Sequence, residues 1–129
     1  MTSSPNCRSF AYGQIAFAPW GSIFRPLIVL NPEVDVPHAI REQLKTFPES
    51  FEICYWIGGD IAFLPGKNII DYDTAVAKGY DKTPLEQSSG PLSNGVDRDT
   101  QMALHVMQHL ISEEPNERVH FVKQSLSVF

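Results

Sequence analysis

The sequence predicts a mainly β fold with a helical part: a small β-barrel of five short strands followed by C-terminal helices. Short apolar segments recur along residues 12–72, separated by Gly, Pro, Asn and Asp, the residues that form tight turns. The last third of the chain instead carries a long segment with apolar residues at helical spacing. Five short strands favour a barrel over a two-sheet sandwich, because a barrel leaves no long open edge.

The length sets the domain organisation. At 129 residues the chain suits one domain with one hydrophobic core. The polar start is rich in Ser and Pro, so we expect a flexible N-terminal arm over residues 1–11. Residues 12–129 then form the single domain, with the barrel over 12–72 and the helical part over 73–129.

The first two strands are expected at Gln14–Ala18 and Arg25–Leu30, with a turn around Gly21. Pro26 lies near the start of the second strand, where a missing N–H is tolerated. The segment Glu33–Ser50 differs in character, because apolar residues recur in it at helical spacing. It is predicted to be a helical insert between the second and third strands.

The clearest β signal is the hairpin within Phe51–Tyr72, where a Gly-Gly-Asp turn ending at Asp60 joins two apolar runs. Strand side chains alternate between two faces. Tyr55 is therefore predicted to face the core, and Trp56 the opposite side. The two sets in the first run are Phe51, Ile53, Tyr55 and Ile57 on one face, and Glu52, Cys54 and Trp56 on the other.

The hairpin is followed by short elements and a loop. Asn68–Ile70 suits a brief strand or helical turn, and Asp73 with Thr74 can cap a short helix that runs to Gly79. Turn-forming residues dominate Asp81–Gly95, which predicts a long loop.

The strongest helix signal covers Val96–Glu114, and Pro115 marks its stop. Its apolar face should pack on the β unit. That face consists of Ala103, Leu104, Met107, Leu110 and Ile111. The tail Arg118–Phe129 fits either a further helix or a docked strand.

Composition excludes several classes of protein. A net charge of −5 argues against a chain whose main task is to neutralise phosphates. Two cysteines, Cys7 and Cys54, provide no disulfide framework and indicate a reducing compartment. No apolar stretch reaches the roughly 20 residues that a membrane span needs. We therefore expect a soluble, intracellular protein that does not enter a membrane.

Groups that could perform catalysis or hold a metal have simpler explanations. His105 and His109 are spaced i, i+4, but no third ligand accompanies them. Asp71 and Asp73 lie at a helix start, where capping explains them, and Cys54 has no evident His partner. We expect no enzyme, no metal and no cofactor.

Two segments carry a family resemblance. Gly13–Ala18 has the form Gly-polar-hydrophobic-hydrophobic-aromatic-Ala, and Ile23–Pro26 stands where a Pro-Trp-Trp-Pro signature would be, keeping one aromatic and the last Pro. The hairpin supplies an aromatic pair, an acidic tip, Ala62–Leu64 and the closure Lys67–Ile70. Over Tyr12–Tyr80 the chain resembles a PWWP domain, a member of the Tudor-type superfamily of SH3-like barrels.

The resemblance implies a chromatin reader that binds a methylated lysine of a histone tail, preferably trimethylated, in an aromatic cage. Its walls would be Trp20, Trp56 and Phe24, with Phe24 requiring a one-residue shift in the shortened turn. Without that shift the wall would be Arg25, which repels a cation. Asp60 and Ser22 are expected to contact the peptide, and Tyr12 is a reserve wall.

The same resemblance implies partners and a location. A basic surface of Arg25, Lys67, Lys78 and Lys82 would contact nucleosomal DNA weakly, since the chain as a whole is acidic. The domain would be a nuclear, monomeric module of a larger protein, and its start at a Met suggests a TFIIS-like elongation factor as the parent. The alternative is a protein-interaction barrel whose cage is degenerate, consistent with Ser22 and Arg25 in usually aromatic places.

Overall fold

The computed structural model describes residues 10–20, 23–81 and 94–126. Its centre is a five-stranded antiparallel sheet in the order β4-β3-β2-β1-β5. The strands are β1 (Ile15–Trp20), β2 (Ile23–Val29), β3 (Phe51–Trp56), β4 (Ile61–Pro65) and β5 (Ile70–Asp71). The predicted order of strands along the chain is confirmed.

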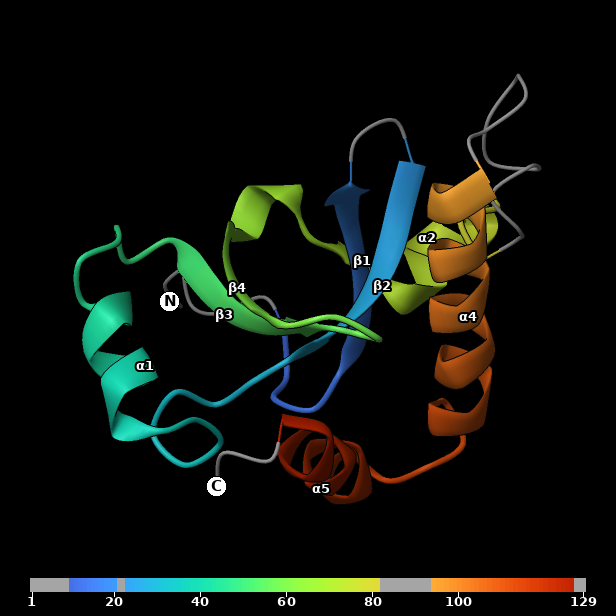
Figure 1. The fold of residues 1–129 in the computed structure, drawn as a ribbon. Coiled ribbons are helices and arrows are strands. Elements are labelled where there is room, and N and C mark those ends of the chain that lie inside the picture. Colours follow the sequence, from blue (N-terminus) through green and yellow to red (C-terminus); the bar gives the residue numbers. More distant parts are fainter. Residues whose placement is uncertain (1–9, 21–22, 82–93, 127–129) are drawn as a thin grey trace.

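The helices are α1 (His38–Leu44), α2 (Tyr72–Ala77), α4 (Asn94–Leu110) and α5 (Pro115–Leu126), with a 3₁₀ turn at Gly66–Asn68. Figure 1 shows α4 beside β2, α5 beneath the sheet, and α1 standing apart on the side of the β3 and β4 hairpin. Both predicted helical regions, the insert and the C-terminal part, are therefore present. In the part of the chain that the structure describes, no helix is long and apolar enough to span a membrane.

The sheet is curved but not closed. Figure 1 shows the hairpin of β3 and β4 crossing β1 and β2 at a steep angle. Among the described strands, β4 and β5 are the two edges and do not pair with each other. The two edges are poor partners for each other, because β4 ends at Pro65, which lacks an N–H, and β5 has only two residues. The sheet has barrel-like curvature with an open seam.

The helix-facing side of the sheet forms the main core. Phe17 from β1, Ile28 from β2 and Tyr55 from β3 are buried there. They share a cluster with Met107 of α4 and Val122 of α5. The predicted apolar face of the long helix is confirmed, because its residues pack on this side of the sheet.

The opposite face of the sheet is buried as well. Its cluster contains Leu27, Cys54 and Trp56, and among its described members none comes from a helix. The curvature of the sheet therefore encloses this face. Phe10 is buried in the same cluster, so the N-terminal arm that we expected over residues 1–11 does not extend that far.

The C-terminal boundaries differ from the prediction. α4 ends at Leu110 and not at Glu114, and Pro115 is the first residue of a new helix. Pro suits that position, since the first helical N–H has no intrahelical partner. The tail is therefore helical as far as Leu126, which resolves the alternative that the sequence left open for its described part.

Arg118 holds the junction between α4 and α5. Its guanidinium donates hydrogen bonds to the carbonyl oxygens of Leu110 at 2.9 Å, Ile111 at 3.0 Å and Gly13 at 3.0 Å. Burial lowers the pKa of Arg118 from its ordinary value, while Glu114 and Glu113 act in the opposite direction. One side chain thus connects the end of α4 with the residues that precede β1.

The cap of α2 is Asp71, two residues before the predicted one. Its carboxylate accepts hydrogen bonds from the Thr74 amide at 3.1 Å and the Thr74 hydroxyl at 2.7 Å. Asp73 lies within the first turn instead. Most of the loop predicted at Asp81–Gly95 lies outside the described residues, and the chain is already helical at Asn94.

Candidate functional site

Trp20 and Trp56, two of the expected cage walls, lie next to each other. Their ring centroids are 5.0 Å apart and their planes are at 80°, so the two indoles are in edge-to-face contact. β1 ends at Trp20, and Trp56 is the last residue of β3, so both belong to strand ends on the enclosed face of the sheet. We call this pair the indole corner.

The two indoles differ in exposure. Trp20 is 42% exposed, whereas Trp56 is only 7% exposed and belongs to the second core cluster. Trp56 therefore contributes to the fold as well as to the corner. Tyr12, the reserve wall, packs partly buried against the same cluster.

Arg25 occupies the space over Trp20. Its guanidinium carbon is 4.6 Å from the centroid of a Trp20 ring, within the range of a cation–π contact. The strand register explains this position, because Arg25 pairs with Ala18, two residues from Trp20 on the same face of β1. A cation of the chain itself thus lies where a cage would hold the ligand's cation.

Phe24 does not join the corner, which corrects the three-walled cage. β1 and β2 pair without interruption from Ile15 and Ile28 to Trp20 and Ile23, so the shift that Phe24 required does not occur. Alternation then directs Phe24 to the helix-facing side. There it stacks on Tyr80, with centroids 4.0 Å apart and planes at 7°.

Asp60 is exposed at the tip of the hairpin. Its carboxylate accepts a hydrogen bond from the Ile61 amide at 2.8 Å, so the side chain already serves the turn. It also lines a groove next to α1, on the other side of the hairpin from Trp56. Ser22, the other predicted peptide contact, lies outside the described residues.

The predicted DNA-contacting residues do not form one exposed set. Arg25 is 7% exposed and lies against Trp20. Lys67 is exposed in the 3₁₀ turn after β4, and Lys78 is exposed at the end of α2. Lys82 is outside the described residues. What remains for phosphate contact is two separate lysines.

Sequence reasoning missed the hollows beside α1 and α5. One of them, of about 710 Å³, lies between α1, the hairpin tip and the end of α5, and we call it the α1 groove. The unexplained insert between β2 and β3 was the signal that could have indicated it, since α1 supplies one wall.

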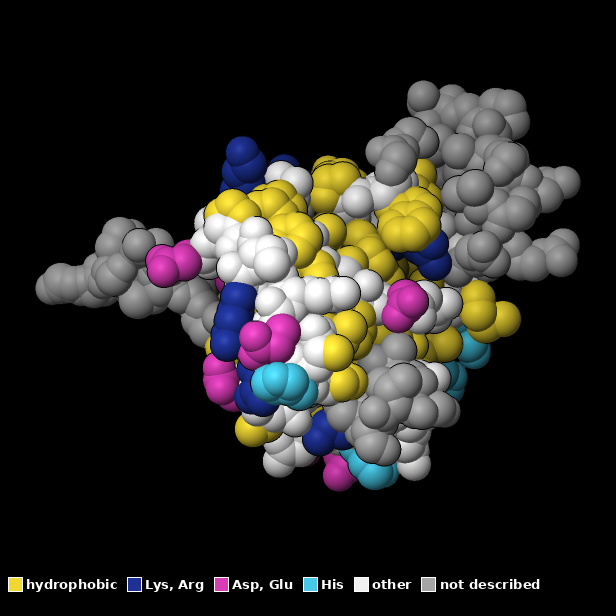
Figure 2. All heavy atoms as spheres, turned by 60° about the vertical axis from the view of Figure 1, so that its left-hand side comes forward, with side chains coloured by type: hydrophobic (Ala, Val, Ile, Leu, Met, Phe, Trp, Pro, Cys, Tyr) yellow, Lys and Arg dark blue, Asp and Glu magenta, His cyan; other side chains and the backbone are white. Residues whose placement is uncertain are grey.

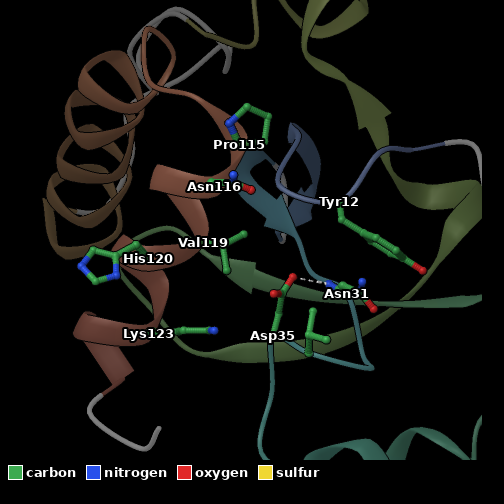
Figure 3. A pocket seen from close by; sticks show the side chains of 9 residues that line it. Tyr12, Asn31, Asp35, Pro115, Asn116, Val119, His120 and Lys123 are labelled. Atoms are coloured by element: carbon green, nitrogen blue, oxygen red, sulfur yellow. Dashed lines mark hydrogen bonds between the residues drawn. The ribbon is translucent and has the colours of Figure 1, made fainter.

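The second hollow, of about 340 Å³, is drawn in Figure 3. It lies between the segment after β2 and the first turns of α5. Asp35 is buried there, and its carboxylate accepts a hydrogen bond from the Asn31 amide at 2.7 Å. Lys123 extends from α5 in the direction of Asp35.

Metal ligands do not gather in the described part of the chain. His105 and His109 lie with ring centroids 4.9 Å apart on the exposed side of α4. Within residues 10–20, 23–81 and 94–126, no three His, Cys, Asp or Glu side chains are placed to share an ion.

No known protein-family model matches this chain, and no curated protein sequence matches it either.

Proposed function

We propose that this protein is a chromatin reader module that binds a trimethylated lysine of a histone tail at the indole corner. The observation that carries the proposal is the corner itself: two indoles at 80° and 5.0 Å, of which Trp20 is 42% exposed. In this proposal the cation contacts the exposed Trp20 ring and the neighbouring Trp56 ring, which pack edge to face. A quaternary ammonium is attracted to aromatic rings by roughly 0.5 to 2 kcal/mol per ring.

The fold supports the same proposal. The PWWP resemblance implies a five-stranded barrel followed by C-terminal helices, and the structure has a curved five-stranded sheet followed by helices packed on one face. Unlike a closed barrel, the sheet has an open seam between β4 and β5. The module would belong to a nuclear transcription or chromatin factor and bind nucleosomes as a monomer.

Arg25 limits the affinity. Its guanidinium lies 4.6 Å from the Trp20 ring centroid, so a trimethyl-ammonium must displace it or use the other surface of Trp20. With two ring walls and a nearby like charge, an isolated peptide should bind with a Kd on the order of 1 mM. Contact with DNA through Lys67 and Lys78 should be weaker still and decline steeply with salt.

The same arginine favours a second candidate function. If the guanidinium keeps its place over Trp20, the corner is a filled cage and the module binds a protein partner without reading methylation. The curved sheet would then serve as a protein-interaction domain with a degenerate cage.

Binding by labelled histone-tail peptides, unmodified and trimethylated, distinguishes the two functions. The reader predicts a preference for trimethyl-lysine that Trp20→Ala abolishes, because half of the corner is removed. Met102→Ala is the matched control, since Met102 is another exposed large apolar residue and lies on α4, away from the corner. Equal binding of modified and unmodified peptides would support the degenerate cage. Trp56→Ala is less suitable, because removing a buried indole costs about 3 to 5 kcal/mol of stability.

A further inference from the structure

The α1 groove is apolar on two sides. Ile40 of α1 and Phe63 of β4 line it, together with Ser125 of α5. No residue of α1 is fully buried, so this helix packs loosely enough to leave the groove open. Figure 2 shows the same side of the molecule, with hydrophobic side chains gathered along the middle and charged side chains around them.

The edge of β4 restricts how a partner can bind there. Trp56 donates to the Asp60 carbonyl, so alternation directs the main-chain groups of Ile61, Phe63 and Pro65 to the outer edge. The Ile61 amide is already bonded to the Asp60 carboxylate, and Pro65 has no N–H. These two residues block a continuous added strand. A ligand of this groove is therefore held mainly through its side chains.

The charge of the groove indicates the class of ligand. Asp60 is the one charged residue among the described residues that line the groove, and its charge is negative. The chain as a whole also has a negative net charge, of −5. An exposed carboxylate beside an apolar channel complements a peptide with a basic residue next to an apolar one.

The groove is linked to the indole corner through the backbone of the hairpin tip. Gly59, which lines the groove, donates its amide hydrogen to the Trp56 carbonyl at 2.8 Å. A Cβ at Gly59 would lie 3.2 Å from the Trp56 Cβ, so the hairpin tip between the groove and Trp56 carries no side chain at this position. An extended peptide seated at the corner can thus continue over the hairpin tip.

We infer that the α1 groove binds the residues that flank the methylated lysine in the same basic peptide. An apolar side chain of the peptide packs between Ile40 and Phe63, and a Lys or Arg lies against Asp60. The inference rests on the proposed function, and it gives the helical insert the role of a second subsite.

The first test compares two lengths of the trimethylated histone-tail peptide that binds best. A peptide of about 15 residues reaches from the corner into the groove, whereas one of about five residues does not, since an extended chain covers about 3.3 Å per residue. The longer peptide should bind roughly tenfold more tightly, because it buries about one apolar side chain more.

Three variants assign the difference to the groove. Ala39→Lys places a positive charge in the groove from an exposed site, and should remove the advantage of the longer peptide. His38→Lys adds a similar charge to exposed α1 outside the described lining, and should leave that advantage intact. Asp60→Asn keeps an oxygen for the Ile61 amide but removes the charge, and should weaken the longer peptide several-fold at low salt.

The outcomes separate the two claims. If trimethyl-lysine is preferred but both lengths bind equally and Ala39→Lys has no effect, the subsite is refuted while the reader stands. If no peptide shows a preference for the methylated form, both fail. A chain that dimerises in sedimentation, with Ala39→Lys abolishing the dimer, would show that a second copy occupies the groove. Shifts of groove amides on removal of residues 127–129, with none on adding peptide, would assign it to the chain's own C-terminus.

Discussion

At the scale of single residues, Arg25 decides what the indole corner can hold. The residue is 7% exposed and its guanidinium carbon lies 4.6 Å from a Trp20 ring centroid, where an incoming cation meets both a competitor and a like charge. Replacing it with an aromatic residue would remove the charge and add a third ring.

Arg25→Phe is therefore expected to strengthen binding of a trimethyl-lysine peptide roughly five- to tenfold, the effect of about one additional ring. Calorimetric titration measures the change, and a melting curve checks that the variant folds. Arg25→Lys is the control, because it keeps the positive charge and should give no gain. A variant that folds and binds no better would show that the guanidinium does not limit the corner.

Gly13 and Gly58 differ in how closely other residues pack against them, and the difference reports how closely α5 packs against the residues before β1. Gly13 and Gly58 both have positive φ, of 85° and 83°. A Cβ at Gly13 would lie 2.8 Å from the Pro115 Cβ, whereas a Cβ at Gly58 would have its nearest contact at 4.0 Å, with Ala103.

Gly58→Ala should therefore cost about 1 kcal/mol of stability from backbone strain alone, and Gly13→Ala about 2 to 4 kcal/mol, because α5 must also move. Denaturant unfolding measures both. Equal losses at the two positions would contradict the close contact between Gly13 and Pro115.

At the scale of elements, α2 depends on its cap. The pKa of Asp71 is lowered in the folded protein, first by its side-chain hydrogen bond with Thr74 and then by the Thr74 amide. A carboxyl group whose folded pKa is depressed stabilises the fold above its unfolded pKa, and that contribution is lost as the pH falls through the folded value.

Asp71→Ala should lower the free energy of unfolding at about pH 7, and the difference from the parent protein should shrink below about pH 4. Asp73→Ala is the matched control in the same turn, and it should have a smaller effect because Asp73 does not make the cap bonds. A loss at Asp71 that does not change with pH would assign the effect to helix propensity.

The junction of α4 and α5 depends on Arg118, which donates to three main-chain carbonyls. Arg118→Ala should cost about 2 to 4 kcal/mol, because partly buried acceptors lose charge-assisted bonds. Arg41→Ala, which removes an exposed contact to Glu33, should cost less than about 1 kcal/mol. Urea unfolding of the two variants measures the contrast, and equal costs would refute the role of Arg118.

Some elements could be predicted from the sequence, whereas the position of Phe24 and the conformation of α5 could not. Alternation and helical spacing were sufficient to predict the hairpin, the two faces of β3 and the buried side of α4. The position of Phe24 was not predictable in the same way, because it depends on the register of β1 with β2. α5 was ambiguous for another reason: its apolar face is narrow, and Arg118 holds it by contacts distant in sequence.

At the scale of the whole molecule, the sheet encloses one face by its own curvature and covers the other with α4 and α5. Strand count and order were predictable from apolar segments and turns, but closure was not, since it depends on how the ends of β4 and β5 meet. The indole corner lies on the enclosed face, and the α1 groove lies across the hairpin from it. A peptide that contacts both the indole corner and the α1 groove would bind across the hairpin tip.

The central claim is that a trimethyl-ammonium group lies between Trp20 and Trp56. The most direct measurement is NMR of the protein with a trimethyl-lysine histone-tail peptide, following both indole N–H signals and the nuclear Overhauser effects from the N-methyl protons. We predict that both signals shift and that the methyl protons show effects to both rings, with the unmodified peptide giving neither. Shifts of the same size with both peptides, or methyl contacts to neither indole, would contradict the account.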